Sequence, residues 1–322
     1  MSNLEVTIRE TAARLLREGQ VAVVLGYEAG SVPFRTAPAF IERAEDAGRL
    51  VWNRFCTNNL AVYLPKLKGA GRIALLAKGC DARSAVTLIQ EHQILRDQVV
   101  ILGIPCDGMV DADRLATSGE SLFGVAIAPG ADGSLTVASG DGQRTLSAAD
   151  ILQERCRLCE HNTPAIADEV LGEPAPRMPG AAEPFAAVAE LERLSPAERQ
   201  AFWHAQLDRC LRCYACREAC PACYCRSCFA DKAAPRWLSK ANAADENWMF
   251  HAVRAFHLAG RCVGCGECER ACPMDIPISK LNRMLDREVR ERFGYVAGLD
   301  PAAVPPLGTF RPDDRDPGKH EG

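Results

Sequence analysis

Two cysteine series in the second half of the chain constrain its fold more than any other feature. Each has the pattern Cys-x-x-Cys-x-x-Cys-x-x-x-Cys-Pro, and their cysteines are Cys210, Cys213, Cys216 and Cys220, then Cys262, Cys265, Cys268 and Cys272. Three thiolates at this spacing can surround one face of a 4Fe-4S cubane, whereas the fourth, before proline, characteristically binds the neighbouring cluster. The pattern predicts two cubanes: one held by Cys210, Cys213, Cys216 and Cys272, the other by Cys262, Cys265, Cys268 and Cys220.

Zinc is the alternative to iron at these cysteines, because Cys-x-x-Cys pairs also form tetrahedral zinc sites. A zinc site has no use for a third evenly spaced cysteine or for the final Cys-Pro. The pattern therefore favours iron-sulfur clusters. A zinc-bound structural or regulatory module is kept as a functional hypothesis, ranked below the two iron-sulfur hypotheses given at the end of this section.

Composition places the protein in a broad class. With 322 residues and 48% hydrophobic content, the chain can form a sizeable core and two domains. It has 16 cysteines but an amphipathic N-terminal pattern rather than a secretory leader, so we expect metal ligands in a reducing cytoplasm instead of disulfides. No apolar run approaches the ~18 residues of a membrane span, so we expect no direct membrane insertion. A net charge of −4 provides no basic footprint for nucleic acid.

The first half of the chain has the pattern of an α/β domain with a mostly parallel sheet. A helix is predicted over residues 6–18, and short apolar runs predict strands at 21–25, 50–52, 73–77 and 99–102. A helical pattern over 83–96 joins the third and fourth strands as a crossover between parallel strands. Turn dipeptides within 121–146 predict a hairpin-like insertion.

Three cysteines of this half, Cys56, Cys80 and Cys106, follow predicted strands. Open α/β sheets bind ligands at the carboxyl edge of their strands, so we interpret these cysteines as part of a site. Cys156 and Cys159 form a Cys-x-x-Cys pair that such loop cysteines could complete. The alternative is that they are scattered buried thiols, since free cysteine is among the most buried residue types.

Proline and alanine in residues 172–184 indicate a domain boundary. Helical patterns follow from Ser195-Pro196, over 246–258 and over 279–292, and the long connection between the two series favours an all-α two-cluster domain. The predicted organisation is an α/β domain at 1–171, a linker at 172–194, the helical domain at 195–297 and a poorly ordered tail at 298–322.

The segments KGCDARSAVTLIQEHQILRDQVVILGIPCDG (78–108) and CRLCEHNTPAIADEVLG (156–172) resemble the beta-subunit family of deazaflavin-reducing hydrogenases and formate dehydrogenases. That family shows a Gly-x-Pro-Cys loop after a strand, then Cys-x-x-Cys followed by Ala-Asp and Gly. The resemblance covers about residues 20–172. The second half is similar to the helical ferredoxin domains fused or bound to such subunits, and to those of heterodisulfide-reductase-type and fumarate-reductase-type complexes.

The resemblance implies a further 4Fe-4S cluster in the first domain, on Cys106, Cys156 and Cys159, with Cys80 preferred as fourth ligand and Cys56 as its substitute. It also implies that an FAD can be present, passing hydride to a deazaflavin or a nicotinamide. The sequence departs from that expectation, because no Gly-x-Gly-x-x-Gly follows a strand. We therefore assign no flavin contacts and no catalytic residue.

The leading functional hypothesis is an iron-sulfur subunit of a cytoplasmic multi-subunit oxidoreductase, a hydrogenase, formate dehydrogenase or heterodisulfide-reductase-like complex, that relays single electrons between other subunits. The alternative is a flavin-containing catalytic subunit that reduces a deazaflavin or NAD(P).

Several residues near the two series have open roles. Cys223, Cys225 and Cys228 exceed what two cubanes need; they could bind another centre, replace Cys220 or simply pack. Arg212 and two other arginines flank the first series, where positive charge would raise a cluster's potential unless they form a solvated face or docking patch. We interpret His251 and His257 as structural or surface residues rather than ligands.

Overall fold

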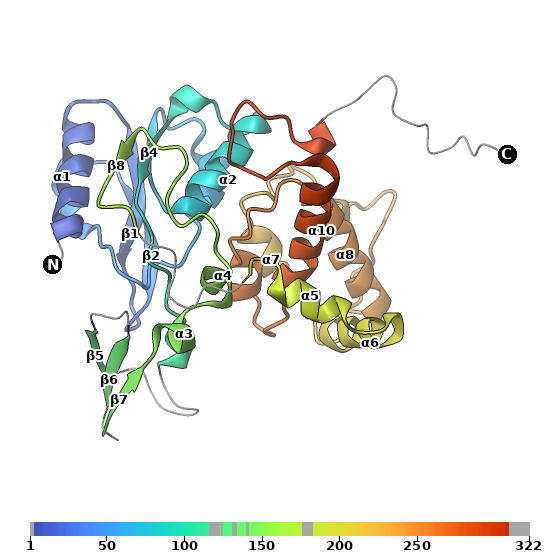
Figure 1. Cartoon of the computed structure of the whole chain (residues 1–322). Helices are drawn as coiled ribbons and strands as arrows, with labels where there is room; N and C mark the ends of the chain where they lie inside the picture. Colours follow the sequence, from blue (N-terminus) through green and yellow to red (C-terminus); the bar gives the residue numbers. More distant parts are fainter. Residues whose placement is uncertain are drawn as a thin grey trace.

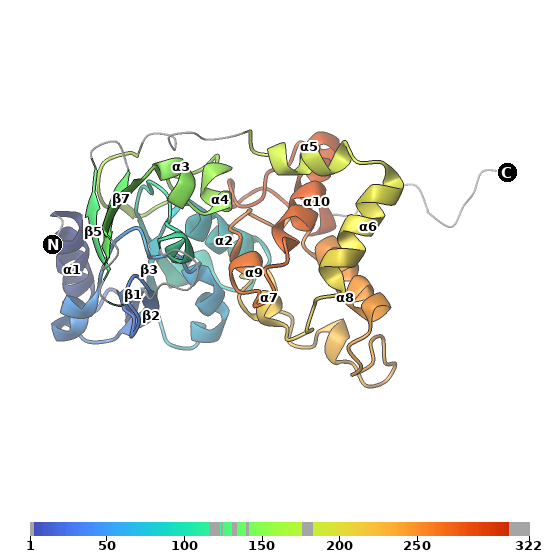
Figure 2. The same cartoon turned by 90° about the horizontal axis from the view of Figure 1, so that it is seen from below.

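The computed structural model describes residues 3–115, 123, 125–130, 134–139, 142–175 and 183–308. An α/β part formed by the first half of the chain lies beside a helical part formed by the second half (Figures 1 and 2). This is the predicted α/β then all-α layout. Within the described ranges, no helix has the length and apolar character needed to cross a bilayer.

The α/β part is built on a mostly parallel sheet with the strand order β2-β1-β3-β4-β8. Its strands are β1 (Val23–Ala29), β2 (Thr36–Ile41), β3 (Ile73–Ala77), β4 (Val99–Gly103) and β8 (Glu169–Val170). The pairs β1–β3, β3–β4 and β4–β8 are parallel, whereas β2 is an antiparallel edge strand. In the central pair, Ile73 lies opposite Val99, so both strands end at the same edge of the sheet.

Both faces of this sheet are covered, which explains why its central strands are continuously apolar. Every residue of β3 and β4 is buried. Leu76 and Leu102 face helix α1 (Asn3–Arg17), whereas Leu75 and Ile101 face helix α2 (Gly79–Gln90). Alternate side chains of a strand point to opposite faces, so a strand between two helical layers has no polar side.

The predicted strands and crossover helix of this part differ in detail from the structure, in which the first strand is Val23–Ala29 rather than 21–25. Residues 50–52 do not form a strand; Leu50 makes only an isolated bridge to Glu28. The second strand is β2, whose Pro38 hid it, because proline in a strand is tolerated only at an edge such as this one. Helix α2 begins at Gly79 rather than Arg83, so the loop after β3 is shorter than expected.

The predicted insertion forms a small antiparallel sheet of β5 (Ala126–Pro129), β6 (Leu135–Ser139) and β7 (Gly142–Leu146). Two short helices then lead back to the main body, α3 (Ala148–Ile151) and α4 (Glu154–Arg157), which carries Cys156. The Ser147 hydroxyl donates to the Asp150 carboxylate at 2.6 Å and so fixes the start of α3. Short 3-10 helices lie at 44–49, 60–67, 96–98 and 112–114.

The helical part consists of α5 (Ala186–Glu192), α6 (Pro196–Leu207), α7 (Ala215–Glu218), α8 (Ala244–His257), α9 (Glu267–Arg270) and α10 (Ile278–Phe293), with 3-10 turns at 229–231 and 306–308. Ser195 caps α6 with Glu198 in a capping box, as Ser195-Pro196 predicts. Helix α5 lies inside the stretch predicted to be a linker, of which residues 176–182 are outside the described residues.

The two parts are joined by an extensive polar interface. Arg83 on α2 donates two hydrogen bonds to the Ala297 carbonyl, at 3.0 and 2.8 Å, and one to the Val263 carbonyl at 3.0 Å. Further ion pairs across the interface are Glu91–Arg261 at 2.9 Å, Glu154–Lys280 at 3.6 Å and Glu160–Arg290 at 2.9 Å. These contacts hold the second cysteine series against the N-terminal loops.

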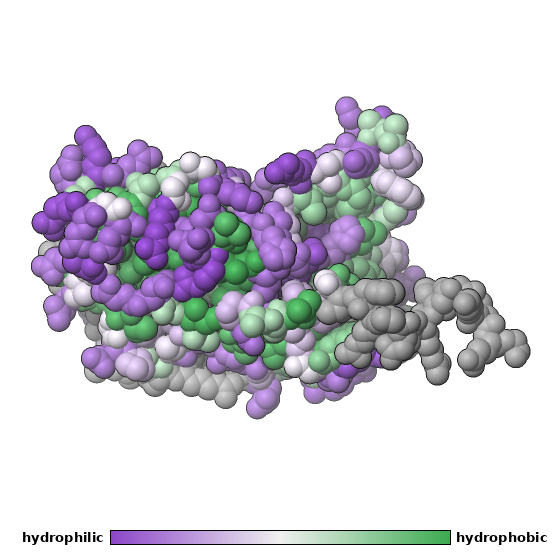
Figure 3. All heavy atoms as spheres, turned by 90° about the horizontal axis from the view of Figure 1, so that it is seen from above, coloured by the Kyte–Doolittle hydropathy of each residue, from purple (hydrophilic) through white to green (hydrophobic). Residues whose placement is uncertain are grey.

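Part of the predicted tail belongs to this folded body. Gln90 on α2 donates to the carbonyls of Asp300 and Ala303 at 2.7 and 2.8 Å. Residues 309–322 of that tail lie outside the described residues. Seen from above, hydrophilic and hydrophobic residues are interspersed over the face that spans both parts (Figure 3).

Candidate iron-sulfur centres

The first group of cysteines surrounds a small cavity, of about 20 Å³, inside the helical part. Its cysteines are Cys210, Cys213 and Cys216 from the first series and Cys272 from the second. Cys210 and Cys216 are buried, and Cys213 is exposed. Buried Phe250, Ile276 and Ile278 make up the apolar part of the wall. The four thiols are the predicted ligand set of one cubane, and the surrounding apolar side chains would exclude water from it.

The second group combines Cys262, Cys265 and Cys268 with Cys220. Burial raises the pKa of Cys262 to about 11 and likewise raises the pKa of the Cys265 and Cys268 thiols. Helix α7, which ends just before Cys220, packs against α9, which carries Cys268, and the nearby Cys220 raises all three pKa values further. Buried thiolates are costly unless cations offset their charge, so this donor set fits a metal cluster.

The two series share an unusual backbone conformation. Arg212 and Gly264, each two residues after the first cysteine, have φ of 48° and 70°, and Tyr214 and Gly266, each after the second cysteine, have φ of 63° and 66°. Left-handed φ is uncommon for residues other than glycine. In both series this turn directs a backbone N–H at sulfur: Arg212 N donates to Cys210 Sγ at 3.3 Å, and Gly264 N–H bonds the Cys262 thiol. The two series therefore fold into the same loop.

Arg212 does not belong to a solvated face. Its side chain is 5% exposed, pairs with the Glu246 carboxylate at 2.6 Å and donates to the Ser239 carbonyl at 2.6 Å. These two contacts fix the loop of the first series, and Glu246 offsets the charge of Arg212. Its effect on a cluster potential stays a prediction.

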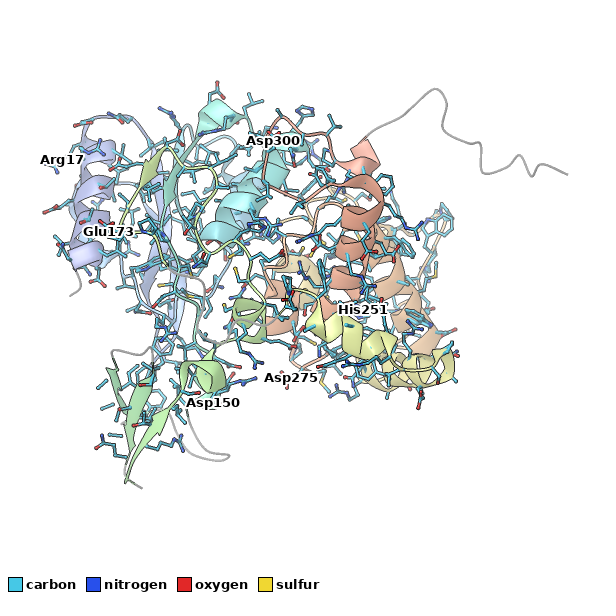
Figure 4. The ribbon with its side chains drawn as sticks, in the orientation of Figure 1. Arg17, Asp150, Glu173, His251, Asp275 and Asp300 are labelled. Atoms are coloured by element: carbon cyan, nitrogen blue, oxygen red, sulfur yellow. The ribbon has the colours of Figure 1, made fainter. Side chains whose placement is uncertain are left out.

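His251 on α8 is buried, and its Nε2 lies 3.3 Å from Cys210 Sγ, within the helical part (Figure 4). Burial lowers the pKa of His251 to about 4, and the neighbouring Arg254 lowers it too, so the ring is neutral near pH 7. A neutral imidazole can still donate one N–H to sulfur. This contact was not predictable from the sequence, because nothing in the spacing of residues 210 and 251 brings them together.

The third group lies between the two parts, beyond the carboxyl ends of β3 and β4. Cys80, Cys106, Cys156 and Cys159 all contribute to the wall of one cavity of about 410 Å³. The backbone N–H groups of Gly108 and Met109 donate to the sulfurs of Cys106 and Cys156, each at 3.4 Å. This is the ligand set that the family resemblance implies.

Cys56 occupies a different environment. It is fully buried in the core between α2 and the sheet, where burial raises its pKa to about 11. Its sulfur contacts the carbonyls of Val51 and of the Asn53 side chain at 3.8 and 3.9 Å. Among the candidates, the geometry favours Cys80 over Cys56 as the fourth ligand.

The extra cysteines Cys223, Cys225 and Cys228 line a separate cavity of about 480 Å³ together with Cys220. Cys223 hydrogen-bonds to Cys220, and Cys228 to Arg217. Cys225 is exposed. Across the described part of the chain, no three histidine, cysteine or carboxylate side chains converge as ligands of a single ion.

Comparisons with known proteins bear directly on these groups. The family model of the 4Fe-4S dicluster domain matches residues 206–276, which contain both complete series. This part of the chain is a 4Fe-4S dicluster domain. The iron-sulfur interpretation of the second half is thereby confirmed.

Curated relatives align with nearly the whole chain. "F420-dependent formate dehydrogenase subunit beta" of Methanocaldococcus jannaschii is 24% identical, over 91% of this chain and 91% of that protein. The "F420-dependent formate dehydrogenase 1 subunit beta" of Methanococcus maripaludis is 26% identical, over 92% of each chain. A chain of the F420-reducing hydrogenase complex from Methanosarcina barkeri aligns at 17% identity and a TM-score of 0.37, over 48% of this chain and 58% of that chain. The resemblance to these beta subunits is confirmed by the curated relatives.

Proposed function

We propose that this protein is the beta-type iron-sulfur subunit of a deazaflavin-linked oxidoreductase complex of the formate dehydrogenase kind. One observation carries the proposal: relatives bearing that name align with more than 90% of the chain, and the aligned length includes all three cysteine groups. Its partners are then the other subunits of such a complex, in the cytoplasm.

The order of the cysteine groups supports an electron relay. Cys265 lines the same cavity as Cys80, so the third group adjoins the second. Helix α7, which carries Cys216, packs against α9, which carries Cys268, so the second group adjoins the first. The groups therefore form a row from the inter-part cavity, through the middle of the molecule, to exposed Cys213.

In this row each set of four thiolates would hold one 4Fe-4S cluster. When bound, such clusters accept and release single electrons at potentials set by hydrogen bonds, charge and solvent exposure. The chain's own contribution is to bury the sulfurs, to donate backbone N–H groups to them from the left-handed turns, and to hold the three groups side by side through the contacts between the two parts. Cys213 lies at the edge where an electron could pass to or from another subunit.

A flavin-containing catalytic subunit is the second candidate function. The observation that favours it is the size of the inter-part cavity and its place at the carboxyl edge of the sheet, where α/β proteins bind cofactors. Lys78, Arg83 and Arg114 contribute positive charge to its wall. An FAD there would make the chain itself the site at which a deazaflavin or NAD(P) is reduced.

The experiment that tests these functions is anaerobic purification of the full chain with iron, sulfide and flavin quantified per chain. Three cubanes predict about 12 irons and as many sulfides. Flavin in equal amount to the chain would favour the catalytic subunit, whereas its absence would favour the relay. Zinc in place of iron would refute both.

A further inference from the structure

Arg155 connects the third cysteine group to the second. It lies on α4 next to Cys156, and its guanidinium donates to the Glu267 carboxylate at 2.7 Å and to the carbonyl of Cys265. Its other terminal nitrogen donates to the Thr57 carbonyl at 2.7 Å. One side chain thus bonds to both parts of the molecule at the place where two candidate clusters adjoin.

The partner of Arg155 is equally enclosed. The side chains of Arg155 and Glu267 are 10% and 3% exposed. Glu267 lies on α9 between Cys265 and Cys268 and also pairs with Arg270 at 2.6 Å. Water therefore screens these charges weakly, and their fields reach the neighbouring sulfurs with little attenuation.

Both groups are held in their charged forms. Arg155 carries a guanidinium, which stays protonated in proteins, and it pairs with Glu267 at 2.7 Å. The Glu267 carboxylate is paired a second time, with Arg270 at 2.6 Å, and two cationic partners favour its ionised form. The site therefore contains a fixed cation from one part and a fixed anion from the other.

The backbone is shaped to admit this arginine. Gly266 has a φ of +66°, and a Cβ at this position would lie 2.6 Å from Cδ of Arg155. The glycine that turns the loop of the second series is also the one over which the Arg155 side chain passes. Glycine is therefore needed at position 266 for two reasons: the backbone is left-handed there, and a residue from the other part occupies the space that a side chain would need.

We propose that Arg155 is a positioning residue that couples the cluster of the third group to that of the second, fixing their separation and setting both potentials jointly with Glu267. This inference rests on the proposed relay function. Reduction adds negative charge to a cluster, so a nearby cation raises its midpoint potential and a nearby anion lowers it. Arg155 and Glu267 therefore act on both clusters with opposite signs.

The test is a redox titration of the full chain, purified anaerobically and monitored by EPR, for Arg155→Gln and Glu267→Gln. Arg155→Gln should lower the midpoint potentials of the second and third clusters, and Glu267→Gln should raise them. The first cluster, which neither residue contacts, should shift least. Arg155→Lys keeps the charge but loses the forked hydrogen bonds, so it should keep the potentials closer to wild type than Arg155→Gln does.

The matched control is Arg287→Gln, which breaks the ion pair with Glu192 between α10 and α5. It should leave all three potentials unchanged. Shifts of the same sign in Arg155→Gln and Glu267→Gln, or no shift in either, would overturn the proposal. If Arg155→Gln loses iron, the midpoint potentials of Glu267→Gln test the proposal alone: a rise at the second and third clusters supports it, and no rise overturns it. A wild-type chain without iron would instead refute the proposed function.

Discussion

Arg83 provides the sharpest test of how the two parts are held together. It is 5% exposed, and its guanidinium satisfies two backbone carbonyls of the helical part, those of Ala297 and Val263, through three hydrogen bonds. The replacement Arg83→Met keeps an unbranched apolar stem and removes every donor. Two buried carbonyls then lose their partners.

The expected cost follows from these contacts. A buried polar group left without a partner costs about 1–3 kcal/mol, so two carbonyls predict a loss of about 2–6 kcal/mol. Burial lowers the pKa of Arg83, which shows that the charge is costly to bury, and methionine removes that cost. We therefore expect the lower half of the range, about 2–4 kcal/mol, which corresponds to a fall in Tm of roughly 3–6 °C for a chain of this length.

The assay is thermal unfolding of the anaerobic holoprotein combined with hydrogen exchange. Exchange should accelerate at residues 262–266 and 295–298, whereas β3 should keep its protection. The control is Arg43→Met, because Arg43 is 68% exposed and pairs only at the surface; we expect a change of less than ~0.5 kcal/mol. A Tm within about 1 °C of wild type, or equal acceleration throughout the chain, would refute the reasoning.

Three further predictions concern the clusters. Cys220→Ser should remove the EPR signal of the second cluster and Cys272→Ser that of the first; the reverse result would contradict the exchange of fourth ligands. In Gly79→Ala the new Cβ would lie 1.9 Å from the His161 carbonyl oxygen, so the third cluster should be lost, with iron falling by about a third, while both dicluster signals persist. His251→Phe should lower the potential of the first cluster alone, since it removes a donor to sulfur; an unchanged potential in the redox titration would exclude that hydrogen bond.

The local features of the fold were predictable from the sequence. Apolar runs located β3 and β4 within a residue, and Ser195-Pro196 located the start of α6. The edge strand β2 was missed because Pro38 weakens the strand pattern, and only pairing with β1 reveals it. A pattern that reports burial cannot detect an element whose stability comes from its neighbour.

In the candidate site, too, local features were predictable from the sequence and contacts between distant residues were not. Regular spacing identified the cysteines of both series, because a short loop must place its ligands at fixed intervals. It could not identify Arg155, which meets Glu267 from 112 residues away in the chain, or His251, which meets Cys210 from 41 away. Contacts of this kind depend on how the two parts dock and leave no period in the sequence.

The left-handed turns give the two series the same backbone conformation, but their loop sequences are not interchangeable. In the first, Tyr214 fits because its ring lies against Phe250 of its own helical part, 5.1 Å between centroids. In the second, the space at Gly264 and Gly266 is filled by Arg283 and Arg155. Grafting the first sequence onto the second loop would place a tyrosine side chain in the space that Arg155 fills. The loop in the middle of the molecule therefore has less room for side chains than the loop of the first series.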